Sequence, residues 1–187
     1  YYDLAIEAYR NVFKRCGLGD VTFLTFASGG AFSKYSHEFQ TLTPSGEDTV
    51  FVDRAKGIAI NHEIYESIKD QPEWQGHSFT EEKAIEVGNI FKLGTRFSDA
   101  FDVKYKDANG QTHPVICASY GIGTTRLIGS IVEVLHDEHG MVWPKSVAPY
   151  AMHLVSLLKS GSEADDLYAF LQKTGVEVLF DDRDLSP

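Results

Sequence analysis

A pair of glycines followed by an arginine is the part of this sequence best suited to chemistry. Gly121 and Gly123 lie in a predicted turn after an apolar strand at 115–118, and Arg126 falls in or near the first turn of the helix that follows. A helix N-terminus carries partial positive charge and unpaired N–H donors, so a cation there is disfavoured unless an anion lies beside it. Backbone amides at the two glycines and a bidentate guanidinium would suit a phosphate group.

The same residues also permit a simpler interpretation. A Gly-x-Gly pair before a helix is a weak motif, and Arg126 stands where a dinucleotide-binding fingerprint has its third glycine. On these residues alone, a phosphate site and a tight turn with a solvated arginine both remain open.

Apolar periodicity predicts the elements that position this turn. One stripe predicts the following helix, which we expect to end at Gly140; it consists of Leu127, Ile128, Ile131, Val132 and Leu135. Upstream, an amphipathic helix over 2–16 precedes strands predicted at 21–26, 36–43 and 48–53. Short consecutive strands with tight turns suggest an antiparallel sheet.

Residues 55–85 are more polar, contain one short predicted helix at 62–68 and break at Pro72 and Gly76. We interpret them as an insertion or linker over the surface. Core sequence resumes at Glu86 with a strand at 86–94, a helical turn at 95–101, and a hairpin of 103–106 with 111–117. The Asn109-Gly110 turn of this hairpin accepts positive φ.

A two-proline connector places a domain boundary near 147–150. Beyond it, apolar runs at 152–158 and 176–180 flank a helix at 162–174, with Leu167, Phe170 and Leu171 expected to face inward. Such a strand–helix–strand unit requires a parallel pair. The expected fold is therefore α+β with an antiparallel sheet over 1–147, followed by the opening of an α/β domain at 148–187.

Composition limits the function classes. The 187 residues are 43% hydrophobic and 24% charged, as in ordinary soluble proteins, and no apolar run is long enough for a membrane helix. The formal net charge of −10 argues against a general polyanion-binding surface but permits a local basic site. Cys16 and Cys117 suggest no disulfide framework, which fits a cytoplasmic protein, and the seven histidines lack zinc-ligand spacing.

Three segments together resemble bacterial-type prolyl-tRNA synthetase, a class II aminoacyl-tRNA synthetase. They are GGAFSKYSHEFQTLTPSGED (29–48), EVGNIFKLGTRFSDAFDV (86–103), and YGIGTTRLIGSIVE with HDEHGMVWPKSVAPY (120–150). The resemblance implies a ligase that joins proline to ATP and transfers the prolyl group to tRNA(Pro). It also implies that residues 120–133 are class II motif 3, with Arg126 as the arginine that holds the ATP tail together with Gly121 and Gly123. Glu86 matches the position that helps hold ATP and Mg²⁺; without the resemblance it reads as a solvated carboxylate at a strand end.

The resemblance places the proline pocket among His37, Glu38, Gly88, Phe91 and Ser119. A saturated ring and a secondary ammonium call for an apolar wall, such as Phe91, and one acceptor, such as Glu38. His37 and Glu38 are adjacent, so a regular strand sends them to opposite faces. Both line the pocket only if the strand is bulged; otherwise one is structural, and we favour Glu38 as the ligand.

Two departures from the family matter. Bacterial-type relatives often carry a large editing domain where only residues 55–85 stand here, so we expect no editing in cis. Motif 1, which forms the homodimer interface, and the motif 2 arginine are also expected upstream of Tyr1, so we interpret the chain as a fragment that is inactive alone and whose last part begins an anticodon-binding domain. The rival interpretations are a non-catalytic synthetase-like paralogue that binds tRNA or nucleotide, and a nucleotide-binding protein unrelated to tRNA.

Overall fold

The computed structural model describes residues 1–30, 34–157 and 162–183. The chain divides into two compact units, Tyr1–Val142 and Trp143–Pro187, a few residues before the boundary predicted from the sequence.

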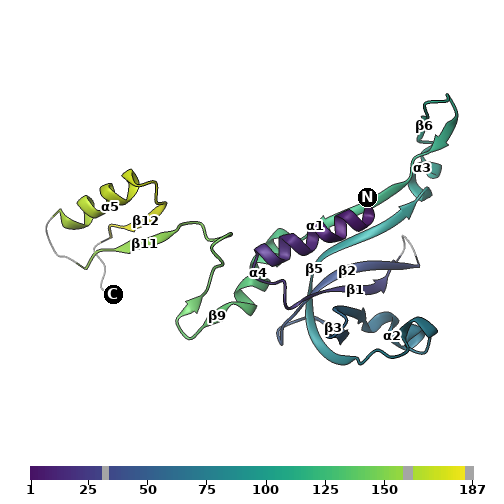
Figure 1. Ribbon diagram of the computed structural model, residues 1–187, viewed down its shortest axis with the longest axis horizontal. Coiled ribbons are helices and arrows are strands. Elements are labelled where there is room, and N and C mark those ends of the chain that lie inside the picture. Colours follow the sequence, from purple (N-terminus) through teal and green to yellow (C-terminus); the bar gives the residue numbers. More distant parts are fainter. Residues whose placement is uncertain (31–33, 158–161, 184–187) are drawn as a thin grey trace. The chain divides into compact units, whose positions relative to one another are not determined.

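Six strands of the first unit form one sheet that closes on itself (Figure 1). They are β1 (Thr22–Ser28), β2 (Tyr35–Leu42), β3 (Asp48–Asp53), β4 (Ile58–Asn61), β5 (Thr80–Gly94) and β8 (Cys117–Ile122). Their order is β2-β1-β4-β3-β5-β8, and β2 also pairs with β5, so the first five strands make a ring. All pairs are antiparallel except β1 with β4, which confirms the expected α+β class dominated by an antiparallel sheet.

The length of β5 makes this closure possible. Its first residues pair with β3, its middle with β2, and its last part with β8. The register with β2 shifts once, because Gly88 lies opposite Phe39 while Glu86 lies opposite Gln40. One strand therefore belongs both to the ring and to the extension that carries β8.

Apolar side chains fill the inner face of the ring and helices cover its outer face. The inner cluster consists of Phe23, Leu42, Val50, Val52, Ala59 and Ala84. Outside, helix α1 (Tyr2–Arg15) packs Tyr9 against Phe39, with ring centroids 5.1 Å apart. Helix α2 (His62–Ile68) and the 3-10 helix η1 (Pro72–Trp74) form a second outer cluster of Ile60, Ile64, Ile68 and Trp74.

The interpretation of residues 55–85 as a surface insertion is wrong. The helix predicted at 62–68 is present, but β4 lies between β1 and β3 and completes the ring. Ala59 and Ile60 are fully buried, and Trp74 is 7% exposed. The apolar run Ile58-Ala59-Ile60 is too short to stand out as a strand within its polar surroundings, although it is buried on both faces.

Two details around Arg126 also differ from the prediction. Residues Tyr120–Ile122 belong to β8 rather than to a turn, because the ladder with β5 extends to Gly88. Helix α4 (Thr124–Val134) ends well before Gly140, which instead lies in the small hairpin of β9 (His136–Asp137) and β10 (Gly140–Met141). Ile128, expected in the buried stripe, is 53% exposed.

The connection between β5 and β8 follows the prediction. Helix α3 (Arg96–Ala100) occupies the expected helical turn, and β6 (Lys104–Lys106) pairs with β7 (Thr112–Pro114) in the expected hairpin. Gly110 has φ 79° in its turn, as the Asn-Gly signal requires.

The second unit contains β11 (Met152–Val155), α5 (Glu163–Lys173) and β12 (Val178–Asp181). The two strands are parallel, as predicted. The expected inward position of Leu167 and Phe170 is wrong, since they are 45% and 61% exposed. A two-stranded sheet offers a helix little surface to pack on, and Tyr168 contacts Phe180 instead.

In the described part of the chain, every helix falls short of the length and apolarity needed to cross a membrane. Cys16 and Cys117 are free thiols.

Candidate functional site

A network of carboxylates and amides lies on the inner side of the sheet around Glu38. Gln40, two residues along β2 and therefore on the same face, donates from Nε2 to Glu38 Oε2 at 3.1 Å and to Asp48 Oδ2 at 2.6 Å. Asn61, at the end of β4, donates from Nδ2 to the same Glu38 oxygen at 3.3 Å. Gln40 is fully buried and Asn61 nearly so. Two amides, from β2 and from the end of β4, thus donate to one carboxylate, and Gln40 links it to Asp48 on β3.

The environment of Glu38 favours its protonated form. Burial, followed by the charge of Glu86 and then by that of Asp48, raises the pKa of Glu38 from 4.5 to about 7, against the amide hydrogen bonds from Gln40 and Asn61. A carboxyl group in this state ionises readily when a cation arrives. The site is therefore suited to bind an ammonium group close to neutral pH.

Arg126 lies beside this network, across β5. Its Nη1 donates to the backbone oxygen of Glu86 at 3.1 Å, and lies 3.3 Å from Glu47 Oε1 and 3.7 Å from Glu86 Oε2. Asn89 Nδ2 holds the other Glu86 oxygen at 3.0 Å. The guanidinium is about half exposed, so it remains accessible to an anion.

One of the two glycines does not act as the sequence suggested. The amide of Gly123 donates to Val87 O at 3.1 Å, and Gly121 pairs with Asn89 within the ladder. The prediction that both free their amides for a phosphate is therefore wrong for Gly123. A Cβ at Gly123 would lie in ordinary contact with Arg126 Cβ, at 3.4 Å, so packing does not require a glycine there.

Register brings Phe91 and Ser119 to the face of Glu38. Asn89 lies opposite both Glu38 and Gly121, and Phe91 lies opposite Ser119. Because side chains alternate along a strand, Asn89 and Phe91 share one face with these partners. Gly88 falls on the other face, where a Cβ would lie 3.2 Å from the ring of Tyr9.

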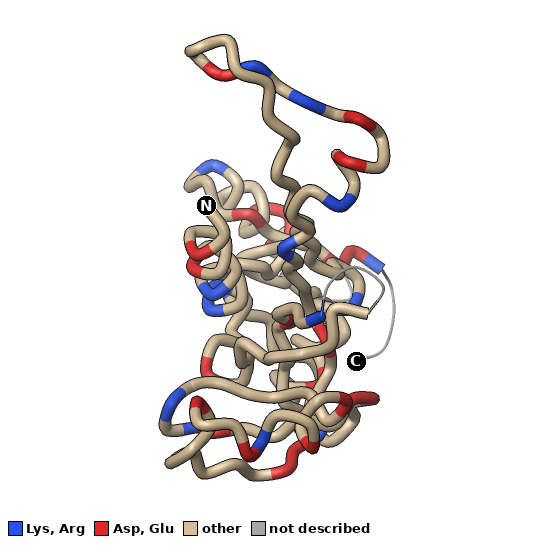
Figure 2. The backbone as a smooth tube through the Cα atoms, turned by 90° about the vertical axis from the view of Figure 1, so that its right-hand side faces the viewer, with Lys and Arg blue, Asp and Glu red and all other residues tan. Residues whose placement is uncertain are grey.

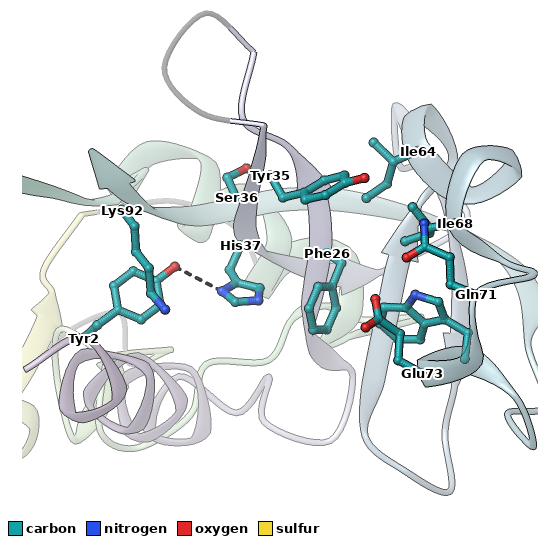
Figure 3. Close-up of a pocket in the computed structure, with 11 residues that line it drawn as sticks. Tyr2, Phe26, Tyr35, Ser36, His37, Ile64, Ile68, Gln71, Glu73 and Lys92 are labelled. Atoms are coloured by element: carbon teal, nitrogen blue, oxygen red, sulfur yellow. Dashed lines mark hydrogen bonds between the residues drawn. The ribbon is translucent and has the colours of Figure 1, made fainter. Parts of the chain in front are cut away.

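His37 points to the opposite side of β2 from Glu38. Its Nδ1 lies 3.0 Å from the hydroxyl of Tyr2, which donates to Ile90 O at 3.1 Å, and its ring packs against Phe26. Burial, and then the charge of Lys92, lowers the pKa of His37. His37 lines an outer pocket of about 260 Å³. Most of the side chains around it are aromatic or aliphatic, and they come from α1, β1, β2, α2, η1 and β5 (Figure 3). The structure therefore separates His37 from the residues gathered around Glu38.

Sequence reasoning missed several members of the network. Gln40 could have been predicted, because it lies two residues after Glu38 on the same strand and therefore on the same face. Asp48 lay at the end of a predicted strand, where its direction was not fixed. Asn61 gave no signal, because its segment was interpreted as surface.

The described residues contain no group of three or more His, Cys, Asp or Glu side chains suited to hold a metal ion. Glu86 alone, with phosphate oxygens, fits the way in which Mg²⁺ is commonly bound, through one or two carboxylates and a nucleotide. The donor set thus suits a metal that arrives with its nucleotide.

Comparison with protein families gives one match over most of the chain. The profile described as "tRNA synthetase class II core domain (G, H, P, S and T)" matches residues 1–135. Among curated proteins, a proline–tRNA ligase of Sulfurimonas denitrificans is 36% identical in an alignment that covers 97% of this chain and 47% of that protein. A proline–tRNA ligase of Anaplasma phagocytophilum is 35% identical and covers 100% of this chain and 47% of its own length.

The chain thus spans about half the length of these curated relatives. Among solved structures, a prolyl-tRNA synthetase from Cryptosporidium parvum, complexed with halofuginone and AMPPNP, matches with a TM-score of 0.63 and 20% identity. The match covers 100% of this chain and 33% of that one. It supports the fold described above.

Proposed function

Because the chain belongs to the class II tRNA synthetase core family, we propose that it forms part of a proline–tRNA ligase. The reaction joins the carboxylate of proline to the α-phosphate of ATP, with release of pyrophosphate, and then transfers the prolyl group to the 3′ end of tRNA(Pro). The observation that carries the proposal is the position of Arg126, hydrogen-bonded to the backbone of Glu86 on the side of the sheet that Glu38 faces.

In this proposal, Glu38 accepts the secondary ammonium of proline and Phe91 supplies an apolar wall. Binding of the cation would return Glu38 to its ionised form, so that the substrate neutralises a carboxylate whose pKa lies near 7. Ser119, opposite Phe91, borders the same pocket. Gly88 serves the pocket through its backbone, and His37 supports it from the outer side of β2.

ATP would bind next to this pocket, on the same side of the sheet, where Arg126 and Glu86 lie. Arg126 would exchange its contacts with Glu47 and Glu86 for the phosphate tail, and would stabilise the charge that develops on the leaving pyrophosphate. Gly121 and Gly123 would border the nucleotide. Mg²⁺, when bound to ATP with the help of Glu86, would supply further positive charge at the phosphates.

The proposal extends to the partners of the whole protein. We propose that residues 148–187 begin an anticodon-binding domain, which the parallel pairing of β11 with β12 supports, and that the full-length protein is a homodimer in the cytoplasm.

The test is proline-dependent exchange of labelled pyrophosphate into ATP, catalysed by the full-length gene product. Exchange that requires proline and Mg²⁺ supports the ligase. A protein that binds ATP or tRNA without any exchange would support a non-catalytic paralogue instead. Exchange dependent on another amino acid would keep the class II activity and reject proline.

A further inference from the structure

We propose that Asn61 is a positioning residue, which holds the Glu38 carboxylate in the orientation that receives the substrate's ammonium group. The inference rests on the proposed role of Glu38. It assigns a part in substrate binding to the segment 55–85, which a reading of the sequence treats as surface.

The orientation of the Asn61 amide is fixed by its two ends. Oδ1 accepts a hydrogen bond from the backbone N–H of Glu63 at 3.1 Å, as the N-cap of α2. Nδ2 is therefore the end that faces Glu38, where it donates to Oε2 at 3.3 Å. A flipped amide would lose the N-cap hydrogen bond and would turn an acceptor toward the ionised carboxylate.

The backbone at Asn61 is held as firmly as its side chain. Asn61 pairs with Val50 of β3. The preceding Ile60 pairs with Phe26 of β1 on one side and with Phe51 of β3 on the other. The residue is 6% exposed. The donor thus comes from a rigid junction between a central strand and a helix.

Glu38 depends on the hydrogen bond from Asn61, because its other donor, Gln40, also donates to Asp48. Gln40 Nε2 lies closer to Asp48, at 2.6 Å, than to Glu38, at 3.1 Å. Around Glu38, the charges of Glu86 and Asp48 oppose its ionisation, and Arg126 is engaged with Glu86 and Glu47. Loss of the Asn61 donor should therefore leave Glu38 less well oriented and more readily protonated.

Asn61→Asp separates this role from a structural one. Aspartate is as good an N-cap as asparagine and interacts favourably with the helix dipole, so the cap of α2 should be retained. The same change removes the donor to Glu38 and adds a negative charge beside it. In the full-length gene product at about pH 7, we expect the KM for proline to rise roughly tenfold or more, with the KM for ATP little changed.

The dependence on pH is the decisive readout. Because a higher pKa of Glu38 is the cause, the increase in KM should shrink as the pH is raised toward about 9. Asn61→Ser keeps a capping hydroxyl without the added charge, and should give a smaller rise with the same trend. Asn11→Asp, the same amide-to-acid change at an exposed position of α1, is the matched control and should behave as wild type.

Each outcome decides between the hypotheses. A KM for proline that equals wild type at every pH, or a loss of melting temperature without any pH trend, overturns the positioning role. If the wild-type protein shows no exchange, the ligase proposal fails, yet the positioning of Glu38 is still measured by NMR titration of its carboxyl carbon. An unchanged Glu38 pKa in both Asn61 variants would then overturn the inference as well.

Discussion

The substrate-binding role proposed for Glu38 comes with a cost in stability. Its pKa is raised from 4.5 in the unfolded chain to about 7 in the fold. The folded state therefore prefers the protonated form, and the stability that this preference contributes is present below the unfolded pKa and lost as the pH rises to about 7. Above that pH, ionised Glu38 strains the network unless a cation binds.

Glu38→Gln should raise the stability of the fold and lower the activity. Glutamine matches the shape of the carboxyl group but never ionises, so at pH 8 the variant should be more stable by roughly 1 kcal/mol, or about 3 °C in melting temperature. The gain should vanish toward pH 4, where wild-type Glu38 is itself neutral. Thermal unfolding across this pH range measures it. Proline-dependent exchange should fall sharply at the same time, and a variant that keeps full activity would contradict the role of Glu38.

Arg126→Lys should lower the exchange rate about tenfold to a hundredfold, the worth of one or two charge-assisted hydrogen bonds. Lysine keeps the charge but cannot donate to Glu86 O while also presenting a planar fork to a phosphate. The KM for ATP should rise more than that for proline in steady-state exchange assays. Arg10→Lys, whose wild-type side chain is paired with Glu7 at the exposed face of α1, is the matched control.

At the scale of single residues, the sequence predicted which residues gather near Glu38 better than it predicted their hydrogen bonds. Adjacent positions on a regular strand predict that His37 and Glu38 face opposite ways, and they do. Gly123 was misassigned because the sequence does not tell whether a backbone amide is already paired across a ladder. The role of Asn61 could not be predicted, because Glu38, to which its side chain donates, lies on another strand.

Among the elements, β4 and α2 carry more of the fold than their short sequences suggest. Ile60→Ala should destabilise the chain by about 2–4 kcal/mol, because it leaves a cavity between the ring and α2 where the side chain is now fully buried. Chemical denaturation measures the loss. Ile128→Ala, at a half-exposed position of α4, should cost less than about 1 kcal/mol. Equal effects would argue that residues 55–85 are not part of the core.

Two glycines offer a test of how closely the β2–β3 turn approaches β5. A Cβ on Gly46 would lie 2.3 Å from the carbonyl oxygen of Ala84, so Gly46→Ala should force the backbone apart and lower stability by about 1–3 kcal/mol. Gly129, inside α4, has nothing within 4 Å of its Cβ position. Gly129→Ala should therefore stabilise by roughly 0.5–1 kcal/mol. Melting temperatures that move in the same direction would contradict this packing.

At the element scale, strong local signals succeeded. The hairpin of β6 and β7, the helix α2 and the parallel pair of the second unit all follow from turn residues and periodicity. Ring closure could not be predicted, since it depends on β5 pairing with three strands along its length. For the same reason β4 was not predicted, because its burial depends on its place between β1 and β3.

On the scale of the whole molecule, acidic and basic positions are interspersed along the chain (Figure 2) within a formal net charge of −10. A polyanion such as tRNA would therefore have to be met by local groups of cations rather than by a uniformly basic surface. Binding of tRNA should accordingly weaken steeply as salt is added.

Discrimination between proline and alanine is a demand on the whole protein. Alanine is smaller than proline and enters any pocket that accepts it, and a missing apolar group is worth only about 1–3 kcal/mol of discrimination. Residues 55–85, where relatives of the family often carry an editing domain, are used here for β4, α2 and η1 within the core. We therefore expect the full-length gene product to charge some tRNA(Pro) with alanine and not to hydrolyse it. Release of labelled alanine from Ala-tRNA(Pro) faster than in buffer would disprove this, with a separately added deacylating enzyme as the positive control.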